Sequence, residues 1–176
     1  MKKIMIFCLM FLFLAAASAH AHVITFNPLL ALFGFTVVDY EMPIYDGMGL
    51  EWSGTGYGYT NPDWAYSAFS LGIMPKFYFN GTAPSGPWWG PIFRYTNGTV
   101  ELKTSKHTAS IYTMSGGLMT GYRWIFGDKP KEGFVLELGV GYLFTGLPAV
   151  DVDGETFSSA GNVSGVAVKF DIGWAF

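Results

Sequence analysis

Charged residues are scarce in this chain of 176 residues: only 13% are Asp, Glu, Lys or Arg, against roughly 25% in soluble domains. Acidic residues outnumber basic ones by 13 to 10, which excludes the basic surface of a nucleic-acid-binding protein. The only cysteine, Cys8, lies near the start of the chain. The rest of the chain therefore has no disulfide, no thiolate nucleophile and no cysteine metal site.

The start of the chain has the pattern of a secretory signal peptide. Lys2-Lys3 is followed by the apolar run Ile4–Ala16 and by the small residues Ala17-Ser18-Ala19. The apolar run is too short for a spanning helix of about 20 residues, although an uncleaved anchor is the alternative. We expect residues 1–19 to be removed before His20, with cleavage after Ala21 as a second option.

Long hydrophobic runs are also missing, because no uninterrupted stretch of 18 apolar residues follows the signal sequence. This pattern argues against membrane-spanning helices. Two segments instead alternate with period two, the pattern of a β-strand. Phe134–Phe144 and Val166–Phe176 carry large apolar residues at even positions and mostly small or charged ones at odd positions. Each has about the length of a tilted membrane-spanning strand, and no amphipathic helix remains to cover the apolar face of a soluble sheet.

Six further strands are expected from weaker patterns, and together the eight predict an all-β fold. We interpret residues 20–176 as a transmembrane antiparallel up-and-down β-barrel of about eight strands, with both termini on the periplasmic side. Residues 27–33 could instead form a short helix or an irregular segment. The six weaker strands lie near 23–33, 35–45, 48–60, 65–79, 87–100 and 110–126.

The connections show the asymmetry of an outer-membrane barrel. Short periplasmic turns are expected at Asp46-Gly47 and at residues 80–86 and 127–133, which are rich in turn-forming residues. Longer outer loops are expected at residues 59–64, 97–109 and 146–162. Pro75 and Pro91 cannot donate to a strand ladder, so we expect a bulge or a strand end near each.

Charged residues within the strands fall on the face opposite the apolar one, so they should point into the lumen. A hairpin centred on Pro130 places Arg123 opposite Glu137, a favourable cross-strand pair. Such a layer could be an ion path or a ligand site, but the interior of eight strands is just wide enough for side chains, which favours a packed, mutually neutralising plug. Further inward residues that would fill the lumen are Tyr66, Tyr78, Trp88, Ile92 and Met119. The predicted lumen layer comprises Asp39, Glu41, Glu51, Lys76, Arg94, Arg123, Glu137, Lys169 and Asp171.

Candidates for catalysis or metal binding are few. His107 lies in a predicted outer loop near Ser105 and Ser110, an arrangement that a hydrolase could use but that is common in loops. The carboxylates of residues 151–155 faintly resemble a calcium loop without its full ligand spacing. His20 and His22 could form only a weak N-terminal metal site. We therefore expect no catalytic residues, metal or cofactor.

The last residues resemble the closing strand of outer-membrane barrels. In those proteins a terminal phenylalanine with alternating apolar residues is recognised by the barrel-assembly machinery, and the matching residues here are Phe170, Ile172, Trp174 and Phe176. More broadly, the chain is similar to OmpA- and OmpX-type eight-stranded barrels.

A narrower resemblance is to an uncharacterised family of small outer-membrane barrels, known only as a domain of unknown function. It implies a fold and an outer-membrane location but no activity. The lipid-A deacylase barrels do not match, because His107 is followed by Thr108 and Ala109 rather than by the His-x-Ser motif. Six segments carry the family resemblance, in this order: Asn27–Leu30, Phe33-Gly34, Asp39–Glu41, Lys76–Gly81, Gly121–Gly127 and Phe134–Gly139.

The function expected from the sequence is that of a non-enzymatic surface barrel, with a role in envelope structure or in binding through its outer loops. Its expected partners are outer-membrane lipids and the assembly machinery, with no nucleic acid. The alternatives are a narrow pore and a lipid-modifying enzyme at the outer rim.

Overall fold

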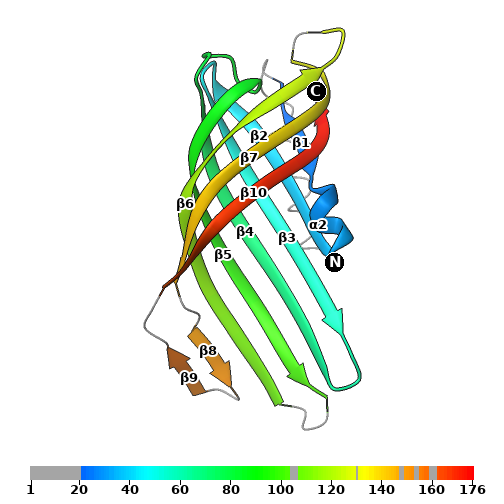
Figure 1. The fold of residues 1–176 in the computed structure, drawn as a ribbon, viewed down its shortest axis with the longest axis vertical. Helices are drawn as coiled ribbons and strands as arrows, with labels where there is room; N and C mark the ends of the chain where they lie inside the picture. Colours follow the sequence, from blue (N-terminus) through cyan, green and yellow to red (C-terminus); the bar gives the residue numbers. More distant parts are fainter. Residues whose placement is uncertain (1–20, 104–106, 130, 147–148, 153–154, 159–161) are drawn as a thin grey trace, which may run out of the picture.

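The computed structural model describes residues 21–103, 107–129, 131–146, 149–152, 155–158 and 162–176. Within these residues, eight antiparallel strands form a closed up-and-down barrel, because β1 pairs with both β2 and β10 (Figure 1). The predicted all-β barrel is confirmed. Its strands are β1 (Val23–Phe26), β2 (Phe35–Tyr45), β3 (Met48–Thr60), β4 (Trp64–Tyr78), β5 (Gly86–Leu102), β6 (His107–Phe126), β7 (Gly133–Gly146) and β10 (Asn162–Ala175).

The two ends of the barrel differ in their connections. One end, called the turn end here, carries the β2–β3 turn at Asp46-Gly47 and the connections of residues 79–85 and 127–132. The first and last strands also meet there, since the His22 amide donates to the Phe176 carbonyl over 2.8 Å. The opposite end, called the loop end, carries the β3–β4 and β5–β6 connections. In Figure 1 the turn end is at the top.

The prediction of a first strand over residues 23–33 is correct only as far as Phe26. The chain continues as a short helix, α2 (Pro28–Leu32), which was the alternative for this segment. Asn27 caps the helix by accepting a hydrogen bond from the Leu30 amide over 2.8 Å, and Pro28 suits the first helical turn. Gly34 then adopts φ +83°, a left-handed conformation that ends the helix and redirects the chain into β2.

The predicted loops at 97–109 and 146–162 are also too long. Asn97-Gly98-Thr99 looks like a loop in sequence, but it pairs with Ser110–Tyr112 and lengthens both strands. In the second segment, β8 (Ala149–Val152) and β9 (Glu155–Ser158) form a hairpin that pairs with β6 beyond the end of β7.

Pro75 and Pro91 interrupt a ladder, as predicted. The β4–β5 pairing breaks between Ile73↔Phe93 and Phe77↔Trp89, the stretch that contains both prolines. The backbone approaches closely at this break, because a Cβ on Gly90 would lie 2.1 Å from the Pro75 carbonyl oxygen. The barrel therefore accommodates the missing donors at a local irregularity near the turn end.

The barrel is polar inside and apolar outside. On β10, Val166 and Val168 point outward and are 72% and 71% exposed, whereas Lys169 and Asp171 point inward and are buried. The same alternation occurs on every long strand, as the pleat requires. Among the described residues, no helix is long and apolar enough to cross a membrane.

Candidate functional site

Eight of the nine charged residues predicted for the lumen meet in one buried group, called the charge layer here. They come from six strands and lie in the half of the barrel nearer the turn end. The register matches the prediction where it was most specific: Arg123 lies directly opposite Glu137, and Phe126 opposite Phe134. The charge layer comprises Asp39, Glu41, Glu51, Lys76, Arg123, Glu137, Lys169 and Asp171.

Arg123 is the centre of the layer and is fully buried. Its Nε donates to Glu137 Oε2 and its Nη1 to Glu41 Oε2, each over 2.6 Å. Nη1 also donates to the Tyr78 hydroxyl over 3.0 Å, and Tyr78 in turn donates to Glu41 Oε1 over 2.7 Å. One guanidinium thus joins carboxylates of β2 and β7 across the lumen, with Tyr78 as a neutral bridge.

Lys76 forms the second crosslink. Its Nζ lies 2.5 Å from both Glu51 Oε2 and Glu137 Oε1, and 3.3 Å from Glu41 Oε2. The ammonium also lies 4.4 Å from the centre of the Trp88 ring, whose face attracts cations. With Arg123, it neutralises Glu41 and Glu51, which face each other directly across β2 and β3 and would otherwise repel.

Lys169 forms the third crosslink, on the loop-end side of the layer. Its Nζ donates to Asp39 Oδ2 and, over 2.8 Å, to Glu51 Oε1, and it lies 2.8 Å from Asp171 Oδ2. Asp171 Oδ1 accepts a hydrogen bond of 3.0 Å from the Asn27 side chain. The layer therefore extends from β3 to the segment that caps α2.

Glycines make room for the large side chains of the lumen. A Cβ on Gly49 would lie 2.1 Å from Glu41 Oε1, so only glycine leaves space for that carboxylate. Gly121 and Gly139 pair across β6 and β7 and form a slot for the Trp88 ring, which lies 2.7 Å and 3.1 Å from where their Cβ atoms would be.

Apolar side chains fill the lumen beside the charge layer. Trp88 is fully buried, and of the five predicted fillers only Tyr66 is less than buried. The layer and this cluster together pack the turn-end half of the barrel. The buried cluster comprises Met74, Tyr78, Ala83, Trp88, Ile92 and Met119.

Arg94 is the exception among the nine predicted residues. It points inward at the level of Ser53 and Asp39, but its side chain makes no hydrogen bond or ion pair within the described part of the chain. It instead borders a cavity of about 140 Å³ next to the layer. The odd or even position of a residue along its strand correctly predicts which face it occupies. It does not predict how far the side chain extends across the lumen.

Sequence reasoning did not predict the positions of two polar residues of this region. Asn27, buried between α2 and β10, could have been found from the Asn-Pro pair, a common helix start. His22 is buried beside β2, where its Nδ1 lies 2.8 Å from the Tyr40 hydroxyl and its ring stacks on Phe176. His22 therefore contributes to the seam between the first and last strands.

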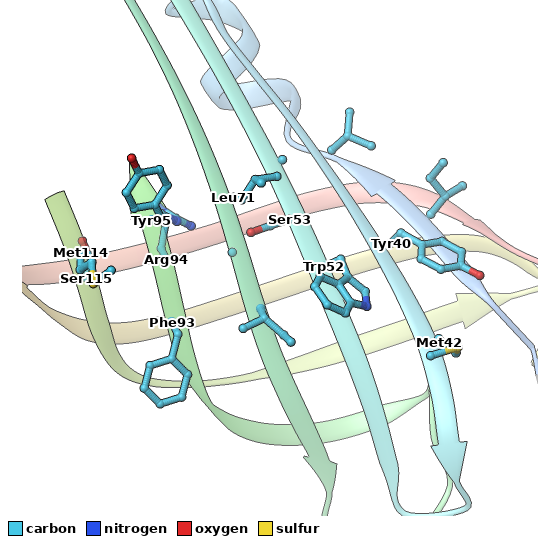
Figure 2. Close-up of a pocket in the computed structure, with 15 residues that line it drawn as sticks. Tyr40, Met42, Trp52, Ser53, Leu71, Phe93, Arg94, Tyr95, Met114 and Ser115 are labelled. Atoms are coloured by element: carbon cyan, nitrogen blue, oxygen red, sulfur yellow. The ribbon is translucent and has the colours of Figure 1, made fainter. Parts of the chain in front are cut away.

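The outward face carries a groove of about 840 Å³ that crosses the strands from β1 to β6. Figure 2 shows its labelled residues, with Tyr40 and Met42 on β2, Trp52 on β3, and Phe93 and Tyr95 on β5. Gly54 also lines the groove, and a Cβ there would meet only the Val38 carbonyl oxygen, at 3.9 Å. The groove is lined almost wholly by apolar side chains, which suits hydrocarbon rather than a polar ligand.

Most of the remaining sequence candidates are not among the described side chains. The side chains of His107 and of residues 147–162 lie outside the described residues, as do His20 and residues 1–19 predicted as a signal peptide. Among the side chains that are described, no three of His, Cys, Asp or Glu are placed to hold a metal ion.

Comparisons with protein-family profiles, curated proteins and solved structures found no match. The class that the fold defines is therefore a small eight-stranded up-and-down β-barrel with a charged, packed lumen. The narrower family resemblance described from the sequence gains no support from these comparisons.

Proposed function

We propose that this chain is a small outer-membrane β-barrel protein, non-enzymatic, that contributes to envelope structure or binds a partner through its loop end. The turn end faces the periplasm in this proposal. The proposal depends on one observation above all: within the described residues, the barrel strands expose apolar side chains around the whole circumference, and the charged side chains away from the strand ends point into the lumen.

The apolar surface forms a continuous belt. Each long strand contributes exposed large residues, such as Leu71 on β4, Phe93 on β5, Leu118 on β6 and Val140 on β7. Exposed charged side chains within the described residues lie instead at turns and strand ends, as at Asp46, Asp63, Glu101, Lys103, Asp128, Lys129 and Glu132. A soluble protein rarely exposes an apolar patch of more than a few hundred Å², whereas a barrel in lipid needs a band about 25 Å tall.

Aromatic side chains mark the edges of this belt. Phe126, Phe134 and Trp174 are exposed near the turn end, and Tyr59 and Trp64 near the loop end. Rings at both edges are typical of membrane barrels, where they lie at the level of the lipid headgroups. The groove across β1–β6 would then hold acyl chains of neighbouring lipids.

The packed lumen favours this proposal over a narrow pore. An open path would have to pass Arg123, Lys76 and Trp88, all of which are fully buried. Stable single-channel steps of the purified protein in a planar bilayer would contradict the packing argument. A role in lipid modification would be indicated by a lipid-A mass change that wild type restores and His107→Ala does not.

The closing strand supports the proposed assembly route. Trp174 is exposed on the outward face of β10, as is Phe176 just after its end, and Phe170 and Ile172 occupy even positions of the same strand. These four residues remain available as an alternating apolar signal for the barrel-assembly machinery. A Phe176→Ala variant that accumulates in the periplasm would support that role.

The first test is fractionation of cells followed by electrophoresis with and without boiling. We expect the protein in outer-membrane fractions, with a band whose migration changes on boiling, because closed barrels resist detergent until heated. A soluble periplasmic protein with no heat-dependent shift would overturn the proposal.

A charge placed on the belt gives a sharper test. Leu118→Arg puts a cation on the exposed face near the middle of β6 and should cost about 2–4 kcal/mol of stability in lipid. Thr108→Arg, on the same outward face at the loop end of β6, is the control and should cost about 0–1 kcal/mol. Unfolding by urea from lipid vesicles measures both, and equal costs would contradict a membrane-spanning belt.

A further inference from the structure

Arg94 is the one cation of the lumen that has no acidic partner among the described residues. The other three each contact at least three carboxylates. The Nε of Arg94 is enclosed without a hydrogen-bond partner, whereas its two Nη atoms, which also form no hydrogen bond with described residues, are not enclosed. A guanidinium is a planar fork of donors that matches a carboxylate or a phosphate. This fork is therefore available to an anion.

The lumen around Arg94 is open to solvent. Inward side chains at this level and beyond it toward the loop end, such as Thr55, Thr96 and Ser115, are partly exposed. Inward side chains of the turn-end half, such as Trp88, are buried instead. Because the turn-end half is packed, a small polar molecule would reach Arg94 from the loop end.

Acidic side chains do not compete for Arg94 on this side. Among the described residues, no inward Asp or Glu lies between Arg94 and the loop end, since Glu101 occupies an outward position and Asp63 lies in the β3–β4 connection. Asp39 is level with Arg94 in register but three strands away around the wall. The charge layer has five carboxylates and three cations, so it repels an anion that passes Arg94.

Hydroxyl groups surround Arg94 on the neighbouring strands. Ser70 and Thr96 form a hydrogen bond of 2.8 Å, and Ser115 and Thr145 form one of 2.9 Å. Ser115 lies directly opposite Arg94 on β6. A hydroxyl donates one hydrogen bond and accepts two, so each pair retains a free O–H and unused lone pairs. Such groups can bond to the hydroxyl groups of a sugar as donors and as acceptors.

Two tyrosines lie beyond the hydroxyl groups, nearer the loop end. Tyr57 and Tyr66 occupy inward positions, and their ring centres are 5.6 Å apart. The Tyr66 hydroxyl lies beside Gly98 of β5, 3.2 Å from where a Cβ would be. Gly98 is four residues from Arg94, roughly 13 Å along the strand. A tyrosine ring has a flat apolar face and a polar tip, which suit one face of a sugar ring.

We propose that the loop-end half of the lumen binds a sugar acid, whose carboxylate pairs with the Arg94 guanidinium. The inference rests on the loop-end binding role proposed above and names its ligand class. The sugar hydroxyl groups bond to the Ser and Thr side chains around Arg94, and Tyr66 packs against the ring. The charge layer stops the ligand at this level, so the barrel holds it rather than conducts it.

Binding is measured by calorimetry on the purified protein in lipid nanodiscs, with D-glucuronate as the probe and D-glucose and acetate as controls. We expect saturable binding of glucuronate, with both controls at least about tenfold weaker. Arg94→Gln should weaken glucuronate binding by about tenfold or more, because it removes the charged fork. Lys103→Gln, which removes an exposed cation at the loop end, should leave it unchanged. No saturable binding to wild type, equal binding to Arg94→Gln, or acetate binding at the same affinity would overturn the proposal.

Two pairs of variants test the contacts with the sugar. Thr96→Val removes a hydroxyl beside Arg94 and should weaken glucuronate binding, whereas Thr99→Val, on the outward face of the same strand, should not. Tyr66→Leu should also weaken it, and the outward Tyr95→Leu should not. Wild-type affinity in both Thr96→Val and Tyr66→Leu would overturn the assignment of a sugar acid.

Charge balance is the competing explanation, because Arg94 and Asp39 border the same cavity and the layer has an excess of acids. In that case Arg94→Gln would lower the midpoint of urea unfolding without ligand, and Arg94→Lys would restore it. The proposal expects an unchanged midpoint in Arg94→Gln and weakened glucuronate binding in Arg94→Lys, since an ammonium lacks the planar fork. A lowered midpoint that Arg94→Lys restores, with wild-type glucuronate affinity in Arg94→Lys, would overturn the proposal.

The failure of this inference is distinguishable from the failure of the proposed function. If the protein is heat-modifiable in the outer membrane and does not bind glucuronate, this inference alone is wrong. If it is a soluble periplasmic protein that binds glucuronate through Arg94, the membrane location is wrong and the site remains.

Discussion

The two halves of the barrel differ in how the wall is closed and how the lumen is filled. Toward the turn end, all eight described barrel strands are paired around the lumen, and the charge layer and Trp88 fill it. Toward the loop end, β1 has ended, α2 replaces a length of wall, and a cavity remains inside. The filled half depends on interior contacts for its stability, and the other half leaves room for binding.

Glycines show the same contrast at single positions. In the turn-end half, a Cβ on Gly49 or Gly121 would collide with a side chain or backbone less than 2.3 Å away. Toward the loop end, Gly56, Gly58 and Gly165 have nothing within 4 Å. The first group is required by close packing, and the second is not. The strands are therefore constrained unequally along their length.

Among the variants that distinguish the two halves, Arg123→Ala should lose the most stability. It leaves Glu41 and Glu137 without their main cation in a fully buried site, which should cost about 3–5 kcal/mol. Lys129→Ala is the control, because Lys129 pairs with Glu132 at the exposed turn end, where loss of a pair costs about 0–1 kcal/mol. The midpoint of urea unfolding from lipid measures both, and equal midpoints would contradict the role of Arg123 as the cation that compensates buried Glu41 and Glu137.

The next largest change in stability is expected when alanine replaces a glycine, and it should differ between one glycine in each half. Gly121→Ala should cost about 1–3 kcal/mol, because its methyl group would meet the Leu138 carbonyl and the Trp88 ring. Gly56→Ala should be neutral, or stabilising by about 0.5–1 kcal/mol, since alanine loses less conformational entropy and has open space there. The same unfolding assay checks the pair. A neutral Gly121→Ala would show that the Trp88 slot is not tightly packed.

The turn-end half was the more predictable from sequence. Alternation with period two fixes which face a residue occupies, so the inward position of Lys76, Glu137 and Lys169 follows from parity alone. The tight 127–133 connection then sets the register that places Arg123 opposite Glu137. Both inferences use only local geometry.

The loop-end half was less predictable because its structure depends on contacts distant in sequence. Polar residues such as Asn97 and Thr99 look like a loop, but they extend a strand because β6 supplies partners. The contacts of Arg94 depend on the width of the lumen at its level, and no sequence pattern gives that width. The tether from Asn27 to Asp171 joins residues 144 positions apart.

The smallest effect concerns that tether, and it tests whether α2, none of whose residues is buried, is weakly held. Asn27→Ala removes both the helix cap and the link to β10, which should cost about 1 kcal/mol. The loss of stability should be confined to the region of α2, because the charge layer keeps its other contacts. Hydrogen exchange should therefore quicken in α2 and Phe35–Val37 while Gly133–Gly146 of β7 stays protected.

One further variant separates the cap from the tether, and a second is a control. Asn27→Asp keeps a good cap but sets a carboxylate against Asp171, so faster exchange in α2 with this variant would assign the effect to the tether. Asn61→Ala removes a comparable side-chain acceptor from the exposed β3–β4 connection, where it bonds the Asp63 and Trp64 amides, and should leave exchange in α2 unchanged. If Asn27→Ala instead quickens exchange across β7 as well, then the two halves unfold as one unit, and α2 is as firmly held as the strands beside it.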